Sequence, residues 1–307
     1  MTKKLECMGN IADALKKAGV EIADQTQGEV KTEGRVAAIE QPSTRQASTV
    51  RVVESENPIG DTSGLIAAGP WNERIQIVLD SMGPVSESFK VLRSKILFPK
   101  DGKARPRTIM IASSSPEEGK SFISINLAVA IARGLDQYAL LVDCDLRRPS
   151  LAGLMGMGVE YTRGLTEYLQ GDSELSELIC RTSINKLSVL PSGSSPQNPA
   201  ELLTSVRMSR LVNELSGRYS DRFIIFDSPP FQVASESLVL AKNVDGVVLV
   251  IGYGKSDRAK LKVMVETLGS EKILGIVFNG QKEGYFKKKM FDPYGSYYGK
   301  YYSSNVK

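Results

Sequence analysis

The segment Ser114–Ser121, with the sequence SSPEEGKS, has the residue types of a phosphate-binding loop. It lies between an apolar segment, Thr108–Ala112, and a segment of helical pattern, Lys120–Arg133. In such a loop, backbone N–H groups and the N-terminus of the helix bind phosphate oxygens. We expect Lys120 to reach the β- and γ-phosphates of a nucleotide and the Ser121 hydroxyl to ligate Mg²⁺. The pattern G-x-x-x-x-G-K-[ST] is met except at its first position, where serine replaces glycine.

Two further apolar segments end in aspartates. LLVDCD carries Asp143 and Asp145, and FIIFDSPP carries Asp227. Residues two apart on a strand point the same way, so Asp143 and Asp145 are expected to face one metal ion. Ligands of open parallel sheets bind beyond the carboxyl ends of the strands, where the loop would also lie. Each aspartate alone also fits a turn or a helix cap, but the set predicts a nucleotide site.

These motifs define the candidate site residues. The nucleotide is expected to contact Ser115, Pro116, Glu117, Glu118, Gly119, Lys120, Ser121 and Phe122. The predicted catalytic residues are Lys120, Asp143, Asp145 and Asp227, and the predicted metal ligands are Ser121, Asp143 and Asp227. The chain has no histidine, which excludes Ser-His-Asp and Cys-His catalysis and metals bound by histidine. Catalysis must therefore use carboxylates, lysine, backbone amides and a hard metal ion.

The elements that would position these residues alternate along the chain. Strands are predicted at Thr108–Ala112, Ala139–Val142, Leu187–Leu190, Phe223–Phe226, Gly246–Tyr253 and Ile273–Phe278. Helices are predicted at Glu87–Leu97, Lys120–Arg133, Ala200–Ser216 and Arg258–Leu268. Strands that alternate with helices indicate right-handed βαβ units. We therefore predict an α/β fold of the P-loop NTPase type, with a mainly parallel sheet flanked by helices.

Three regions are expected. Residues 1–70 are predicted to hold a short helix, Asn10–Ala18, and a flexible linker rich in Gln, Thr, Ser and Glu. Residues 71–280 form the nucleotide-binding domain. Residues 281–307 form a flexible tail, in which the alternation of apolar segments ends and six of the eleven tyrosines lie.

The composition is that of a globular protein without a membrane span. Apolar residues make up 41% of the chain and charged residues 24%, with a net charge of +4, which gives no reason to expect nucleic acid as a partner. The three cysteines are widely spaced, so no zinc site or disulfide framework is predicted, and free thiols suit the cytosol. The apolar segments fall short of the roughly 20 residues that a span requires, and no signal peptide is visible.

The combination of motifs resembles the bacterial tyrosine kinases of capsule and exopolysaccharide systems. That family has a phosphate loop relaxed at its first glycine, a second motif of three apolar residues and D-x-D-x-R, and a third that ends in D-x-P-P. Here the second motif is Leu140–Arg147 and the third is Ile224–Pro230. The resemblance covers the chain from about Ser86 to the C-terminus. One departure is Glu117, at a position where the family often has glycine.

The resemblance implies an autokinase that uses ATP and Mg²⁺. Its substrates would be tyrosines of the tail, in trans within a homo-oligomer: Tyr294, Tyr297, Tyr298, Tyr301 and Tyr302. Asp143 is favoured as the acceptor of the phenol proton. The family's ring-forming motif E-x-x-R-x-x-R corresponds to Glu87, Lys90 and Arg93, where lysine lacks the planar fork of arginine.

The resemblance also implies partners and a location. A membrane-bound polysaccharide co-polymerase would activate the kinase, and a cognate tyrosine phosphatase would reverse its reaction. The protein would be cytoplasmic and reach the inner face of the cell membrane through that partner.

Two other functions remain open on the sequence. One is a Min/Par-type ATPase switch, which shares the fold but generally has a lysine where this chain has Ser115, and lacks the tyrosine-rich tail. The other is a non-catalytic ATP-binding scaffold. A eukaryotic-type kinase is excluded, because the HRD and DFG motifs are missing.

Overall fold

A computed structural model describes residues 4–7, 66–67, 71–73, 75, 84–99, 104–158, 163–218, 221–231 and 236–281. The predicted helix Asn10–Ala18 and the tail tyrosines lie outside this part of the chain. Within it, no helix combines the length and the apolar character needed to cross a membrane.

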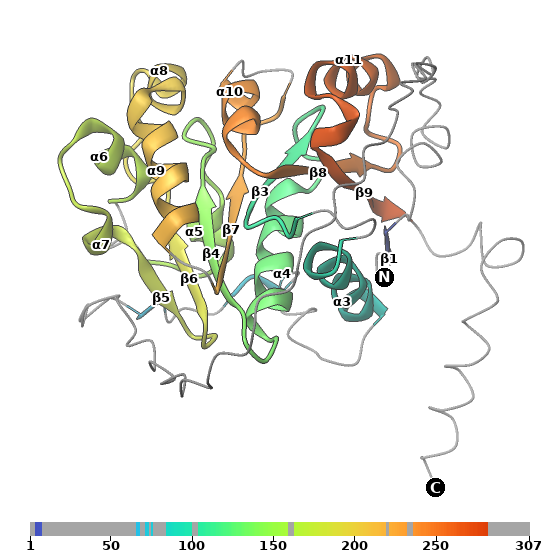
Figure 1. The fold of residues 1–307 in the computed structure, drawn as a ribbon, viewed down its shortest axis with the longest axis horizontal. Coiled ribbons are helices and arrows are strands. Elements are labelled where there is room, and N and C mark those ends of the chain that lie inside the picture. The colour runs from blue at the N-terminus through green and yellow to red at the C-terminus, as the bar shows by residue number, and fades with distance from the viewer. Residues whose placement is uncertain are drawn as a thin grey trace, which may run out of the picture.

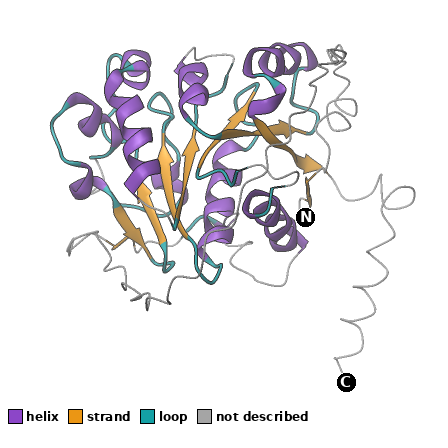
Figure 2. Cartoon of the chain, in the orientation of Figure 1, coloured by secondary structure: helices purple, strands orange, loops and turns teal. Residues whose placement is uncertain are grey.

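Within the described residues, nine strands form one twisted sheet (Figure 2). They are β1 (Lys4–Cys7), β2 (Ile66–Ala67), β3 (Thr108–Ser113), β4 (Tyr138–Asp143), β5 (Cys180–Thr182), β6 (Leu187–Leu190), β7 (Arg222–Asp227), β8 (Gly246–Gly252) and β9 (Ile273–Gln281). Their order is β1-β9-β8-β3-β7-β4-β6-β5-β2. The β1–β9 and β5–β6 pairs are antiparallel and all others parallel, which confirms the predicted sheet.

Helices cover both faces of this sheet. They are α3 (Pro84–Leu97), α4 (Lys120–Ala132), α5 (Leu151–Leu154), α6 (Leu165–Gln170), α7 (Leu175–Leu178), α8 (Pro199–Thr204), α9 (Val206–Arg218), α10 (Glu236–Asn243) and α11 (Arg258–Leu268), with a short 3₁₀ turn at Ser270–Lys272. Residues of α3, α4 and α5 belong to one apolar cluster, and residues of α6 to α11 belong to another. In the view of Figure 1, α8, α10 and α11 lie along the top and α3 lies below them.

The central strands owe their place to continuous apolar sequence. Along β3, Ile109 and Ile111 join the cluster beneath α4, whereas Met110 and Ala112 join the cluster on the opposite face. A strand that is buried on both faces must be apolar at every position, as parallel strands usually are. The polar residues that follow such strands then gather at one edge of the sheet, where their carboxyl ends meet.

The structure also contains elements that the sequence did not predict. Strands β1 and β2 lie in the region expected to be a helix and a linker, and α10 was not anticipated. The predicted helix Ala200–Ser216 is in fact two helices, α8 and α9. Ser205 interrupts it with an extended backbone, ψ 155°, and its hydroxyl accepts the N–H of Met208 at 3.1 Å, as an N-cap does.

Candidate nucleotide-binding site

The loop between β3 and α4 folds as an anion-binding turn. Glu117 and Gly119 both have left-handed backbone, with φ of 58° and 99°. Alternation of left-handed and right-handed residues turns successive N–H groups toward one point. Inside the turn, the buried Glu118 carboxylate accepts the N–H of Ser114 at 3.1 Å and its hydroxyl at 3.0 Å. The serine that replaces the first glycine of the pattern is thus bonded to the loop's own glutamate.

Strand β9 contacts the loop through Asn279, which the sequence did not single out. Its Nδ2 donates to the backbone oxygen of Glu118 at 2.9 Å. A Cβ on Gly119 would lie 1.9 Å from that same nitrogen, so only glycine fits here. The signal that could have identified Asn279 is its place after an apolar strand segment, the same signal that identified the aspartates.

Glu117 adopts a conformation that glycine would adopt more easily. The Lys255 ammonium donates a hydrogen bond to the backbone oxygen of Glu117 at 3.2 Å and lies 3.6 Å from the Glu117 carboxylate. Both side chains are largely exposed, so this pair adds little stability. The loop thus holds a left-handed residue that carries a Cβ at the position where the family often has glycine.

We expect Glu117→Gly to raise the free energy of unfolding by about 1 kcal/mol, because left-handed backbone costs a residue with a Cβ about that much. Urea denaturation of the nucleotide-free protein measures it. Glu117→Ala is the control, since it removes the carboxylate and keeps the Cβ. A glycine variant no more stable than the alanine variant would contradict this reading of the turn.

Lys120, the first residue of α4, is buried among carboxylates. The residue is 7% exposed. Burial lowers the pKa of Lys120, while the charges of Asp227, Asp145 and Glu118 act in the opposite direction. The ammonium therefore lies within electrostatic reach of two of the three predicted aspartates, as the sequence predicted.

Asp143 is the last residue of β4 and is paired in register with Asp227 of β7. It is fully buried. One of its oxygens accepts the N–H of Asp145 at 3.1 Å, and the other accepts those of Ser150 and Leu151 at 3.3 and 3.2 Å. Burial, reinforced by the charge of Asp227, raises the pKa of Asp143 well above its usual value.

Asp227 has an oxygen available for a metal ion. Its Oδ1 accepts the hydroxyl of Ser124 at 2.9 Å. Its Oδ2 is buried and has no hydrogen-bond partner in the described part of the chain. Burial raises the pKa of Asp227 to about 6. A buried carboxylate oxygen with no donor fits a cation.

The oxygen donors around Asp227 suit Mg²⁺. Ser121 lies at the start of α4, and its hydroxyl accepts that of Ser150 at 2.8 Å. Among the described residues there is no cluster of three or more His, Cys, Asp or Glu that could hold a metal by itself. Mg²⁺ needs none, because it typically binds one or two carboxylates together with water and substrate phosphates. Ser121, Asp143 and Asp227 could hold it in this way.

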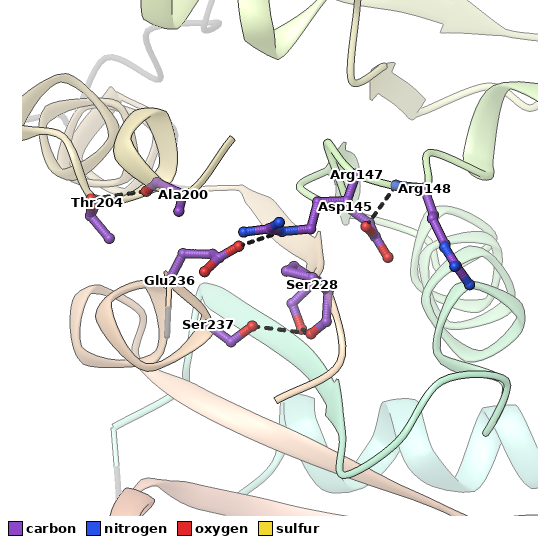
Figure 3. A network of polar contacts seen from close by, with 9 residues as sticks. Asp145, Arg147, Arg148, Ala200, Thr204, Ser228, Glu236 and Ser237 are labelled. Carbon is purple, nitrogen blue, oxygen red and sulfur yellow. Dashed lines mark hydrogen bonds and ion pairs between the residues drawn. The ribbon is translucent and has the colours of Figure 1, made fainter. Parts of the chain in front are cut away.

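Asp145 reaches the site from a loop rather than from a strand. The sequence placed Asp143 and Asp145 on one strand, but β4 ends at Asp143. The Asp145 carboxylate accepts the N–H of Arg148 at 3.0 Å (Figure 3). Burial raises its pKa, although the side chain is more accessible than that of Asp143. Asp143 and Asp145 therefore lie close together through a turn after β4 and not through strand alternation.

The side chains of the other predicted loop residues make few contacts within the site, and these residues, proline excepted, are expected to bind phosphate through backbone N–H groups. The Ser115 carbonyl accepts the hydroxyl of Ser113 at 2.7 Å, and Pro116 is exposed. The ring of Phe122 makes an edge contact with Phe89 of α3, with centroids 6.0 Å apart. The Phe122 side chain thus packs against a neighbouring helix.

The three residues of the predicted oligomer motif lie along α3. Glu87 and Lys90 form an ion pair of 2.6 Å, and both side chains are largely exposed. Arg93 is half-buried and donates to the backbone oxygen of Ala130 in α4 at 2.7 Å. Two of the three residues therefore remain on the outer face of the helix.

Comparison with known proteins gives a consistent result. Residues 109–291 match the family described as the CobQ/CobB/MinD/ParA nucleotide binding domain. Tyrosine-protein kinase YwqD of Bacillus subtilis is 37% identical over 200 residues, which are 64% of this chain and 81% of that protein. Tyrosine-protein kinase CpsD of Streptococcus agalactiae is 32% identical over 230 residues, which are 73% of this chain and 96% of that protein.

Solved structures resemble the fold as well. The kinase domain of Escherichia coli tyrosine kinase ETK has a TM-score of 0.61 and 28% identity, over 69% of this chain and 83% of that one. The chimerical protein CapA2B2 has a TM-score of 0.62 and 32% identity, over 72% of this chain and 96% of that one.

Proposed function

This chain belongs to the bacterial tyrosine kinases, within the CobQ/CobB/MinD/ParA family of nucleotide-binding domains, and we propose that it phosphorylates tyrosines of its own C-terminal segment. The main observation behind the proposal is that Lys120 and a cluster of aspartates lie together at one edge of the sheet. Residues 71–280 are then the kinase domain, and residues 281–307 are its substrate.

The proposed nucleotide is ATP with Mg²⁺. Backbone N–H groups of the loop from Ser115 to Phe122, except that of proline, bind its phosphates at the N-terminus of α4. Ser121, Asp143 and Asp227 hold the metal ion. When bound, Mg²⁺ neutralises charge on the β- and γ-phosphate oxygens.

In the proposed transfer, the phenol oxygen of a tail tyrosine bonds to the γ-phosphorus of ATP. The bond from that phosphorus to the β,γ-bridging oxygen breaks, and ADP leaves with its electron pair. Lys120 stabilises the charge on the transferred group. We assign the phenol proton to Asp145 instead of Asp143, the residue favoured on the sequence. Both oxygens of Asp143 already accept backbone N–H groups, whereas the side chain of Asp145 is more accessible to an incoming tyrosine.

The proposed acceptors are Tyr294, Tyr297, Tyr298, Tyr301 and Tyr302. Residues 280–307 are 28 in number and could span at most about 90 Å, at about 3.3 Å per residue. This reach permits transfer within one chain or to a neighbouring copy. We propose transfer between copies, in an oligomer whose contacts include the exposed Glu87–Lys90 face of α3 and also Arg93.

The proposed setting is capsule or exopolysaccharide export. A membrane-bound co-polymerase would bring the kinase to the inner face of the membrane and activate it, and a tyrosine phosphatase would reset the tail. Each phosphate adds about −1.5 to −2 charges, so a phosphorylated cluster would repel its neighbours in an oligomer and favour dissociation.

The test is mass spectrometry of tail peptides after the purified protein is incubated with Mg²⁺ and ATP. We expect phosphate on tyrosines between residues 294 and 302, and none in an Asp143→Asn variant. A variant with the five proposed acceptor tyrosines changed to phenylalanine is the control, since it keeps the whole site. ATP turnover with an unmodified wild-type tail, both alone and with the cytoplasmic segment of a co-polymerase, would indicate a Min/Par-type ATPase instead.

A further inference from the structure

Glu236 is a buried carboxylate that neither the motifs nor the proposed chemistry uses. It is the first residue of α10, and its side chain is 1% exposed. Its Oε1 accepts the Nε–H of Arg147 at 3.0 Å. Its Oε2 is buried and makes no hydrogen bond within the described residues. A buried charge of this kind depends on its single described cationic neighbour.

Arg147 belongs to the loop that carries two of the predicted catalytic aspartates. The start of this loop is fixed by backbone, because the N–H of Cys144 donates to the Asp227 carbonyl at 2.8 Å. Figure 3 shows the Arg147 side chain reaching away from Asp145 to meet Glu236. The Arg147–Glu236 pair therefore ties the far part of the loop to α10.

The start of α10 is in turn held to the segment that follows Asp227. The buried hydroxyl of Ser237 donates to the Pro229 carbonyl at 3.1 Å (Figure 3). The Ser228 hydroxyl donates to the Ile111 carbonyl at 2.9 Å, which joins this segment to β3. The N-terminus of α10, where Glu236 lies, is thus hydrogen-bonded to the D-x-P-P segment, which is itself bonded to β3. From this fixed position Glu236 binds Arg147 of the aspartate loop.

We infer that Glu236 is a positioning residue, which through Arg147 holds the Asp143–Arg148 loop in the form that receives the Mg²⁺–nucleotide complex. The inference builds on the proposed function. Without the carboxylate, the Arg147 side chain loses its bond to α10. The loop is then held at its start by the backbone bond of Cys144, while its far part can move. Displacements of about 1 Å in such a site reduce rates by roughly 100-fold.

The experiment compares Glu236→Gln, Arg147→Gln and the double variant with the wild type. Two quantities are measured on each: the affinity for fluorescently labelled ADP with and without Mg²⁺, and kcat and KM for ATP in tail phosphorylation. We expect each variant to bind ADP without Mg²⁺ as tightly as the wild type does. The factor by which Mg²⁺ increases the affinity for ADP should be about tenfold smaller in each variant than in the wild type. We expect kcat to fall by about 10- to 100-fold with KM changed less than threefold.

The double variant separates positioning from independent effects. The effects of substitutions at two residues that act through the same contact are not additive. The double variant should therefore lose as much Mg²⁺-dependent affinity and kcat as each single variant does. Glu214→Gln is the matched control, since it removes a carboxylate from an exposed 3.0 Å pair with Arg218 on α9. It should leave every quantity unchanged.

Three results would overturn the inference. The first is a Glu236→Gln variant within twofold of the wild type in both measurements, and the second is a double variant in which the losses of the single variants multiply. The third is a loss of metal-free ADP affinity in proportion to the unfolded fraction of the variant. If the wild type phosphorylates no tyrosine, the proposed function fails on its own. The Mg²⁺-dependent ADP affinity then still decides the role of Glu236.

Discussion

Replacing Lys120 with methionine should lower the rate of tail phosphorylation by at least about 1000-fold, while the protein stays folded. Loss of a single preorganised donor to a developing charge typically costs 100- to 1000-fold. Lys120 begins α4 directly after the loop, at the helix N-terminus where the phosphates are predicted to bind. The measurement is the initial rate of label transfer from γ-labelled ATP.

Methionine suits this position because it fills nearly the same volume without a charge. Lys120 is 7% exposed and burial lowers the pKa of its ammonium, so an uncharged side chain of similar size suits this buried position. Lys262→Met is the control, as it breaks an exposed 3.9 Å pair with Glu266 on α11. A Lys120→Met variant with more than a tenth of the wild-type rate would exclude Lys120 from the transfer.

Asp227→Asn should have opposite effects on activity and stability. Activity should fall by about 100-fold or more, because the substitution removes a charge that the metal ion needs. At pH 7 the nucleotide-free variant should be more stable than the wild type by about 1–3 kcal/mol, because the wild type ionises a buried group whose pKa is raised. Urea denaturation across a pH series measures the second effect.

The pH series has a definite direction. The pKa of Asp227 is about 6 in the folded protein and has a reference value of 3.8. Between about pH 4 and 6 the folded state binds more protons, so the wild type loses stability as pH rises through this window. The advantage of the variant should widen from about pH 4 to 6 and then stay constant.

Asp245→Asn provides the contrast for this second prediction. Asp245 accepts the N–H groups of Arg107 and Thr108 at 2.7 and 2.9 Å, so its charge has donors. It should be neutral or slightly destabilising and leave activity unchanged. A destabilised Asp227→Asn variant at pH 7 would show that the carboxylate supports the fold rather than straining it.

The central sheet and most of the site could be predicted because both depend on local pattern. Apolar runs such as Thr108–Ala112 and Phe223–Phe226 could be placed only inside a sheet, and a polar residue at the end of such a run must lie at its edge. Asp143 and Asp227 were predicted in this way, and Lys120 was predicted from the G-K-S pattern of the loop.

Residues whose role depends on tertiary contact could not be predicted. Glu236 shows no local motif, and it acts through Arg147 on a loop that is distant in the sequence. Strand β1 was missed because four residues carry too little periodicity, and its partner β9 lies at the other end of the chain. Helix α10 was missed because its eight residues, Glu236–Asn243, give only a short periodic pattern.

The pairing of β1 with β9 has a consequence for the behaviour of the kinase in a crowded cell. Strand β9 would otherwise be the last strand of a largely parallel sheet, and unpaired backbone on such a strand invites the strand of another molecule to add to it. β1 occupies that position in antiparallel register, with Lys4 opposite Gln281 and Cys7 opposite Val277. The longer strand β9 is thus covered within the molecule, and the edge that remains on this side is the four-residue strand β1, which offers little backbone to the strand of another molecule.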